Sequence, residues 1–340
     1  MSRLWLARSK MKILLVRLDG IGDALACTPL VAALRDAGHL LGIALTLRNA
    51  AVFAAETFAW THVLERRAWP AHGHAATGVD AMIAQARTIA YDLALVASEE
   101  PDAYVLAERC APRRIGFING WEKPLKTFIL ARRLDRAISR TATPARVREH
   151  EVETMFGLGA GLTQEVSPTR DVRRLLPLVC DSAVQPQRTI AVQLSPKWTA
   201  MRVSRSDLTS VVRELARLAP VRLLASGEET AELRSFGVAS DGIDSVVFHG
   251  ADGMRAWKRA IAEAGVLITP DSGAAHVAGM TGTPCVDVFP HSSHVRADMR
   301  RWRPWAARSA LLIADRDAPV VSAARDLLET RAAWPKNAHC

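Results

Sequence analysis

The sequence has few cysteines, and no two of them are close enough to form a recognisable pair. The 340 residues contain five, with no C-x-x-C spacing, at Cys27, Cys110, Cys180, Cys285 and Cys340. This distribution excludes a disulfide framework and a thiolate metal site, and it fits a reducing compartment.

Long uncharged apolar runs are also absent. Arg8, Lys10, Lys12 and Arg17 interrupt the apolar residues near the start, which excludes a signal peptide or a membrane span there, and no later run is long enough. Low-complexity tracts and short repeats are missing too. We therefore expect a folded protein of the cytoplasm.

What the chain does contain is a regular alternation of apolar strand patterns and helical patterns, in an order typical of α/β proteins with parallel sheets. The predicted strands are 12–17, 43–47, 91–97, 113–117, 189–194, 221–225, 245–249, 266–269 and 285–289, the last closing the second sheet. The predicted helices are 28–38, 79–90, 101–110, 204–218, 228–236, 252–264, 272–280 and 320–333.

The length and one weakly patterned stretch divide this alternation into two domains. A chain of 340 residues fits two domains of about 150 residues each. Residues 163–187 carry three prolines and predict a linker. We expect doubly wound, Rossmann-like domains over 11–165 and 188–318, facing across a cleft, and a C-terminal helix within 319–340 that packs back on the N-terminal domain. Ligands of such sheets lie beyond the carboxyl ends of the strands.

The loop after the first strand contains Gly20, Gly22 and Asp23. It is not a dinucleotide fingerprint, because Leu25 stands where a third glycine is needed and the second strand ends at Arg48 instead of an acid. Two interpretations of Asp23 remain open: a carboxylate with a chemical role at the cleft, and an acid that caps the following helix.

Two loops of the second half carry weaker signals. Ser195, Lys197 and Arg202 follow one strand, where cations can neutralise a diphosphate, although surface cations are common. Gly227 and Glu228 follow the next strand; the carboxylate suits a ribose hydroxyl and equally suits a helix start.

The loop after the strand at 266–269 predicts an anion site. Asp271, Ser272 and Gly273 precede a helix of small residues, so free backbone N–H groups and the helix dipole can hold a phosphate. His276 lies one turn into this helix. A core histidine is the alternative, and the preceding Asp-Ser-Gly favours a functional role.

Basic residues are concentrated between Arg113 and Arg148, where ten of them face only two acids. Such a segment attracts an anionic partner, unless it only forms solvated helix faces. Trp121 and Phe128 are its only aromatics apart from Phe117, which argues against nucleic acid as the partner. The histidine pairs His72/His74 and His291/His294 lack companions at metal-ligand spacing, so we expect no metal and no cofactor.

Taken in order, these loops resemble the lipopolysaccharide heptosyltransferases of glycosyltransferase family nine, from about Lys12 to Leu312. The opening KILLVRLDGIGDALACTPLVAALR is similar to the first strand, Gly-Asp loop and Thr-Pro helix of that family. TPDSGAAHVAGMTGTPCVDVF closely matches its most specific signature, D-S/T-G-x-x-H-x-A-x-x-x-G-x-P-x-V-x-x-F. RRIGF and WRPW match weaker features.

The resemblance implies a GT-B fold, with the acceptor on the N-terminal domain and the donor on the C-terminal one. It implies inverting, metal-independent transfer of a heptose from an ADP-sugar to the lipopolysaccharide core, with peripheral contact at the inner face of the cell membrane. It makes Asp23 the general base. The expected donor residues are Ser195, Lys197, Arg202, Gly227, Glu228, Asp271, Ser272, Gly273 and His276. The expected contacts to an anionic, lipid-linked glycan acceptor are Gly22, Arg113, Arg114 and Lys123.

Two departures lie near the expected donor pocket. Met201-Arg202-Val203-Ser204 stands where the family has Lys-x-Trp-Pro, and Phe289-Pro290-His291 replaces Phe-Gly-Pro. The sugar is therefore less defined than the reaction class. The alternative function is a non-catalytic or repurposed sugar-nucleotide-binding protein.

Overall fold

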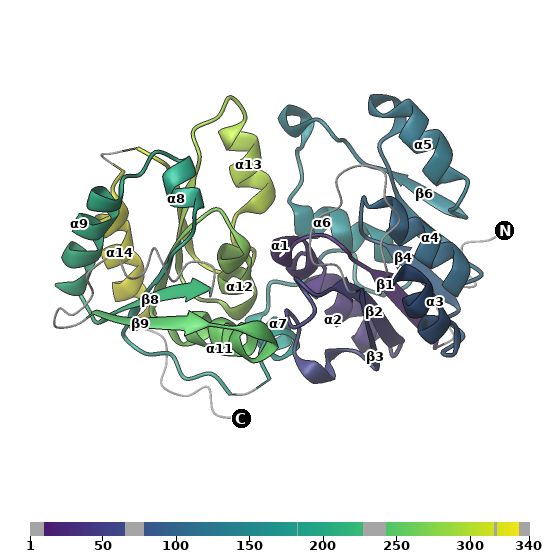
Figure 1. Ribbon diagram of the computed structural model, residues 1–340, viewed down its shortest axis with the longest axis horizontal. Helices are drawn as coiled ribbons and strands as arrows, with labels where there is room; N and C mark the ends of the chain where they lie inside the picture. The colour runs from purple at the N-terminus through teal and green to yellow at the C-terminus, as the bar shows by residue number, and fades with distance from the viewer. Residues whose placement is uncertain (1–9, 65–77, 182, 227–242, 316–317, 333–340) are drawn as a thin grey trace. The chain divides into compact units, whose positions relative to one another are not determined.

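The computed structural model describes residues 10–64, 78–181, 183–226, 243–315 and 318–332 (Figure 1). The chain divides into two compact units, Met1–Leu178 and Val179–Cys340. The division falls within the stretch 163–187, where the sequence predicts a linker. Part of that stretch is nevertheless regular, because helix α7 covers Val172–Val179.

The first unit contains a six-stranded parallel sheet in the order β3-β2-β1-β4-β5-β6. Its strands are β1 Lys12–Val16, β2 Leu40–Thr46, β3 Trp60–Leu64, β4 Leu93–Val96, β5 Arg114–Ile118 and β6 Arg136–Ser139. The sequence predicts β1, β2, β4 and β5 but misses β3 and β6. Both are edge strands with several exposed or half-buried side chains, so they lack the continuous apolar run of a central parallel strand.

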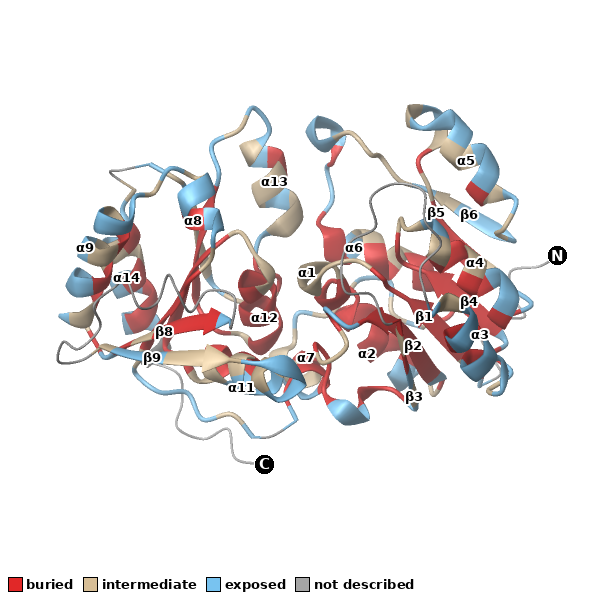
Figure 2. Ribbon diagram, in the orientation of Figure 1, coloured by how far each residue is buried: buried red, intermediate tan, exposed pale blue. Residues whose placement is uncertain are grey.

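Helices cover this sheet, and α3 and α4 share a buried apolar cluster with β1 and β4 on one side of it (Figure 2). The helices of the first unit before α7 are α1 Ile21–Leu25, α2 Thr28–Asp36, α3 Val79–Arg87, α4 Pro101–Cys110, α5 Pro124–Ala131 and α6 Glu151–Phe156. The sequence predicts α2, α3 and α4. It misses α1 and α6, which are too short to show a helical period of apolar residues. It also misses α5, in which only Leu130 is buried.

The second unit repeats the same strand order, β9-β8-β7-β10-β11-β12, again all parallel. Its strands are β7 Ile190–Gln193, β8 Val221–Ser226, β9 Ile243–Phe248, β10 Val266–Pro270, β11 Cys285–Phe289 and β12 Ser309–Ile313. The prediction that 285–289 closes the sheet is wrong, because β12 pairs with β11 and forms the edge. The side chains of β12 are only partly buried, which conceals the strand in the sequence.

Helices α9 and α14 pack on one face of this second sheet and share its apolar core. The described helices of the unit are α8 Lys197–Ala200, α9 Arg205–Ala216, α11 Gly250–Glu263, α12 Gly273–Thr281, α13 Val295–Trp302 and α14 Val320–Ala332. The expectation that the C-terminal helix packs on the N-terminal domain is corrected here, since Val320, Ala324 and Leu328 of α14 belong to the second unit's own core. The helix predicted over 228–236 lies outside the described residues.

No helix in the described ranges combines the length and the apolarity that a membrane span requires. Both units instead bury their apolar strands between helices, which places the loops at the strand ends as the positions open to a ligand.

Close packing of α12 against the loop before β12 gives a first prediction. A Cβ atom on Gly279 would lie 2.5 Å from the backbone nitrogen of Trp305 and 3.1 Å from Cα of Pro304. Because neither backbone atom can yield cheaply, we expect Gly279→Ala to lower the free energy of unfolding by about 1–3 kcal/mol, measured by urea denaturation.

Gly157→Ala is the matched control for this substitution. Gly157 has a φ of −57°, and no heavy atom lies within 4 Å of its Cβ position. We expect a change within about 0.5 kcal/mol. Equal effects of the two substitutions would contradict the packing argument.

Candidate functional site

In both sheets the chain first adds strands on one side of the central strand and then on the other. Ligands of open α/β sheets bind at the point where this order of addition reverses. In the first unit the reversal lies between β1 and β4, and in the second between β7 and β10. The loops that follow these four strands form two half-sites, one in each unit.

In the first unit, the carboxylate of Asp23 is held at the start of α1. Its Oδ2 accepts the backbone N–H of Gly20 at 3.1 Å, and its Oδ1 accepts from a guanidinium nitrogen of Arg17 at 2.7 Å. The capping interpretation is therefore correct. The Asp23 side chain is still 33% exposed, so the capping role leaves the carboxylate accessible to a ligand.

The partner of Asp23 is a buried arginine that directly extends β1. The Arg17 side chain is only 2% exposed, and its guanidinium also lies 3.4 Å from Asp19 Oδ2 and 3.8 Å from Glu151 Oε1. Burial alone would lower the pKa of Arg17, but Asp19 and Asp23 outweigh it and raise that pKa. Arg17 is therefore a fixed positive charge beneath the loop.

Asp19 lies deeper in the same loop than Asp23. Burial raises the pKa of the Asp19 carboxyl, and the nearby charge of Arg17 only partly offsets this effect. Its buried Oδ2 has no hydrogen-bond partner. The two aspartates thus differ in environment: the Asp23 side chain is 33% exposed, while the Asp19 side chain is 17% exposed and more strongly desolvated.

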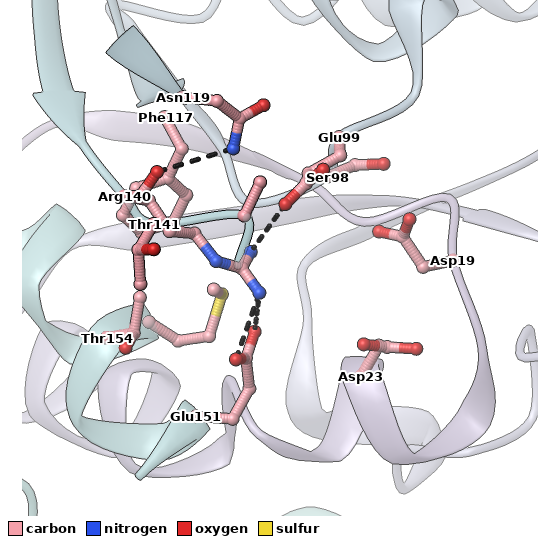
Figure 3. Close-up of polar contacts among 12 residues, drawn as sticks. Asp19, Asp23, Ser98, Glu99, Phe117, Asn119, Arg140, Thr141, Glu151 and Thr154 are labelled. Atoms are coloured by element: carbon pink, nitrogen blue, oxygen red, sulfur yellow. Dashed lines mark hydrogen bonds and ion pairs between the residues drawn. The ribbon is translucent and has the colours of Figure 1, made fainter. Parts of the chain in front are cut away.

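A second arginine extends the charged network away from Asp23 (Figure 3). Arg140 contacts both oxygens of Glu151, at 2.8 and 3.0 Å, and lies 3.6 Å from Glu99 Oε1. Glu99 in turn faces Lys126 at 3.5 Å and Lys123 at 3.9 Å. Burial raises the pKa of Glu99, but these three cations bring it below its usual range.

Sequence inspection missed most of this network. Arg17, Glu99, Arg140 and Glu151 come from four segments that only the fold brings together. One signal was available: Arg17 interrupts an otherwise apolar strand run, and a charge in that position needs buried partners.

The expected acceptor residues are divided between the two ends of the strands of the first sheet: the edge formed by the carboxyl ends and the edge formed by the amino ends. Gly22, in α1, and Lys123, beside Glu99, lie at the edge where Asp23 is found. Arg113 and Arg114 precede or begin β5, so they lie at the opposite edge, and Arg114 is held by both oxygens of Asp135. The structure does not bring these two arginines to Asp23.

In the second unit, Trp198 fixes the loop that follows β7. Its buried indole N–H donates to the carbonyl of Gln193 at 2.8 Å. The neighbouring Lys197 thereby reaches the loop after β10, where its Nζ donates to the carbonyl of Asp271. Arg202 has a φ of +63°, the left-handed region that favours glycine. A non-glycine residue held there is typical of functional loops.

The N-terminus of α12 has the features expected of an anion site. Ser272 is its N-cap and accepts from the backbone N–H of Ala274 at 3.3 Å, while Thr269 contacts the Ser272 hydroxyl at 2.9 Å. Gly273 is the first helical residue, and the helix dipole adds partial positive charge at this end. His276, one turn in, is buried and packs edge-on against Trp302 at 5.6 Å.

Two further carboxyls lie beside this helix start. Burial raises the pKa of Asp271, against the opposing effect of Lys197. Asp287 of β11 is fully buried, neither of its oxygens has a hydrogen-bond partner, and burial raises its pKa well above the usual range. Val286 and Val288 belong to the core on the α9 side, so strand alternation directs Asp287 to the other face, the one that α12 covers.

The remaining predicted residues give less information. Ser195 precedes Lys197 and accepts the backbone N–H of Lys197 at 3.3 Å. Gly227 and Glu228, like His72 and His74, lie outside the described residues. Within the described residues, His, Cys, Asp and Glu form no group of three or more that could hold a metal ion.

Comparison with known proteins rests on structure alone. No family model matches the sequence, and no curated protein matches it. A glycosyl transferase family 9 protein from Veillonella parvula has a TM-score of 0.71 at 15% identity, over 94% of this chain and 98% of that one. The Escherichia coli heptosyltransferase WaaC with ADP has a TM-score of 0.69 at 15% identity, over 94% and 100%.

The Escherichia coli ADP-heptose lps heptosyltransferase II is similar to the same degree, with a TM-score of 0.68 at 16% identity over 95% of this chain and 100% of that one. The chain thus has the fold of these proteins along nearly its whole length. The predicted α/β, GT-B fold of two Rossmann-like units is confirmed.

The buried Asp287 carboxyl predicts a pH-dependent stability. Its pKa is raised on folding, so above the usual carboxyl pKa the unfolded chain loses a proton that the folded chain keeps. Stability then falls as the pH rises, by at most about 1.4 kcal/mol per pH unit. We expect Asp287→Asn, neutral in both states, to lose this dependence.

Melting temperatures from about pH 4 to 8 test this expectation. The melting temperature of Asp287→Asn minus that of the wild type should rise with pH, whatever the value of this difference at the lowest pH. Asp326→Asn, an exposed change on α14, is the control and should run parallel to the wild type. Parallel curves for Asp287→Asn would show that Asp287 is ionised in the folded protein.

Proposed function

We propose that this protein is an inverting, metal-independent glycosyltransferase. It moves a heptose or a related sugar from an ADP-sugar to the lipopolysaccharide core or a similar anionic, lipid-linked glycan at the inner face of the cell membrane. The geometry of Asp23 is the observation that carries the proposal: an accessible carboxylate, oriented by Arg17 and Gly20, at the ligand-binding edge of the first sheet.

This carboxylate suits a general base. Arg17 and Gly20 orient its two oxygens, and the side chain is 33% exposed, so an acceptor hydroxyl can reach it. In the proposed reaction an acceptor hydroxyl attacks the anomeric carbon and gives its proton to Asp23. The bond from that carbon to the diphosphate oxygen breaks, and the ADP leaves with the electron pair. Because the hydroxyl attacks from the face opposite the ADP, the anomeric configuration is inverted.

The second unit supplies what the leaving group needs. Negative charge accumulates on the diphosphate as the bond stretches, and the first backbone N–H groups of α12 with Lys197 can stabilise it. The similarity to WaaC with ADP supports an adenine nucleotide as the donor carrier.

The role of Asp23 can be separated from that of its neighbour. We expect Asp23→Ala to lower kcat by about 10²–10⁴-fold, the usual contribution of a general base, while ADP binding, measured by calorimetry, stays unchanged. Asp19→Asn is the matched control in the same loop, and its turnover should stay within about tenfold of the wild type.

The opposite pattern, with Asp19→Asn inactive and Asp23→Ala active, would make Asp19 the base. If the wild type binds ADP-sugars but releases no ADP in the presence of any glycan acceptor, the protein is a sugar-nucleotide binder instead of a transferase.

Lys197 gives a separate prediction about the donor half-site. We expect Lys197→Met to weaken ADP binding about tenfold or more through loss of a charge-assisted contact to phosphate. Arg205→Met, at an exposed cation that begins α9, is the control and should bind ADP like the wild type. Equal affinities of both variants would remove Lys197 from the donor site.

A further inference from the structure

A second surface of the first unit carries apolar side chains into solvent. The short 3-10 turn Gly120–Glu122 and the adjoining helix α5 form it. The exposed fractions are 95% for Trp121, 73% for Leu125, 56% for Phe128 and 50% for Ile129. Leu125, Phe128 and Ile129 have i, i+3, i+4 spacing and share one face of α5, while Leu130 is buried in the core.

The backbone beneath these side chains is firmly held. Thr127 Oγ1 donates to the carbonyl of Gly120 at 2.9 Å, which ties the turn to α5. Glu122 accepts from the Thr141 hydroxyl at 2.8 Å and from the backbone N–H of Thr143 at 3.1 Å. The exposure of Trp121 therefore belongs to an ordered loop and calls for a partner.

Positive charge lies beside the apolar side chains. Arg132 stacks on the ring of Phe128 at 4.0 Å. An aromatic ring attracts a guanidinium but does not neutralise its charge. Lys123 and Lys126 lie at the same surface, where they share Glu99.

We propose that the turn 120–122 and helix α5, which we call the α5 surface, dock this protein on an anionic lipid bilayer. Exposed Trp, Leu, Phe and Ile side chains enter the boundary between headgroups and acyl chains, and the cations above them contact lipid phosphates. Tryptophan favours this depth because its ring is amphipathic.

The composition of the surface favours lipid over other partners. Nucleic acid would be recognised by cations interleaved with stacking aromatics, yet two of the four apolar side chains are aliphatic. A second copy of this chain would bring an equally basic surface against this one, and like charges oppose such an interface.

Docking at this place has a consequence for the active half-site. The turn 120–122 and the start of α5 lie at the Asp23 edge of the first sheet, and the ion pairs from Lys126 through Glu99, Arg140, Glu151 and Arg17 connect them to that carboxylate. A lipid-linked acceptor in the same bilayer is then concentrated beside the base. This step rests on the proposed function, whereas bilayer binding does not.

Vesicle co-sedimentation without donor or acceptor tests the docking. We expect the wild type to bind phosphatidylglycerol-rich vesicles, to bind pure phosphatidylcholine vesicles at least about tenfold less, and to dissociate in high salt. The double variant Trp121→Ser/Phe128→Ser should lose at least about tenfold in its partition coefficient. Arg132→Glu should lose binding to the anionic vesicles only.

Val166→Ser is the control, because Val166 is 98% exposed outside this surface, and its binding should equal that of the wild type. The proposal is overturned if the wild type ignores anionic vesicles or if Trp121→Ser/Phe128→Ser binds them normally. It is also overturned if the double variant keeps vesicle binding but loses a different interaction of the wild type. That interaction would be either a lipid-free dimer, seen by sedimentation velocity, or binding to an oligonucleotide.

Enzyme kinetics provide a second test that separates docking from catalysis. With a lipid-linked acceptor in vesicles, the Trp121→Ser/Phe128→Ser variant should show a KM raised about tenfold or more with kcat preserved. With a delipidated acceptor in solution it should match the wild type. Loss of turnover with both acceptors would place these residues in the reaction instead of in docking.

Discussion

The guanidinium of Arg17 is charged at every pH that the fold survives, and it lies almost wholly out of water. Charge in that position is tolerated only beside carboxylates, so Asp19, Asp23 and Glu151 have to converge on it from two separate segments. Their convergence fixes the loop after β1 against the start of α6. It also brings Arg140 in, since Glu151 is shared between the two arginines. The position of Asp23 is therefore set by the need to compensate the buried charge of Arg17. The same contact that stabilises the unit also orients this candidate base.

The two half-sites use electrostatics in opposite ways. The first surrounds an accessible carboxylate with buried ion pairs, so its charges are already compensated within the protein. The second offers the N-terminus of α12, with Ser272 as its N-cap, and a lysine whose Nζ donates to the backbone carbonyl of Asp271, so positive potential is available for a ligand. An acceptor that must lose a proton suits the first environment, and a diphosphate that gains charge suits the second.

The alternation of apolar strands and helices was sufficient to predict the two-unit α/β architecture, because central parallel strands bury both faces and remain visible in the sequence. Edge strands such as β6 and β12 escaped because none of their side chains is fully buried. Asp23, Lys197 and Ser272 could be found from their positions directly after strands. Glu151 and Arg140 could not, because their significance depends on contacts with Arg17 and Glu99 across the fold. Asp287 was hidden for a different reason: alternation within β11 shows which face it takes, but only the packed structure shows that no partner meets it there.

Both sheets have one strand order, with the first strand of each unit at the centre and the fourth beside it. Each unit can keep this scaffold and differ only in its loops. The same two loops, after the first and fourth strands, hold acids in one unit and a lysine with a helix start in the other. A change of ligand in either unit would then require few substitutions and no rearrangement of its core, because the shared topology already places the variable positions where a ligand can reach them.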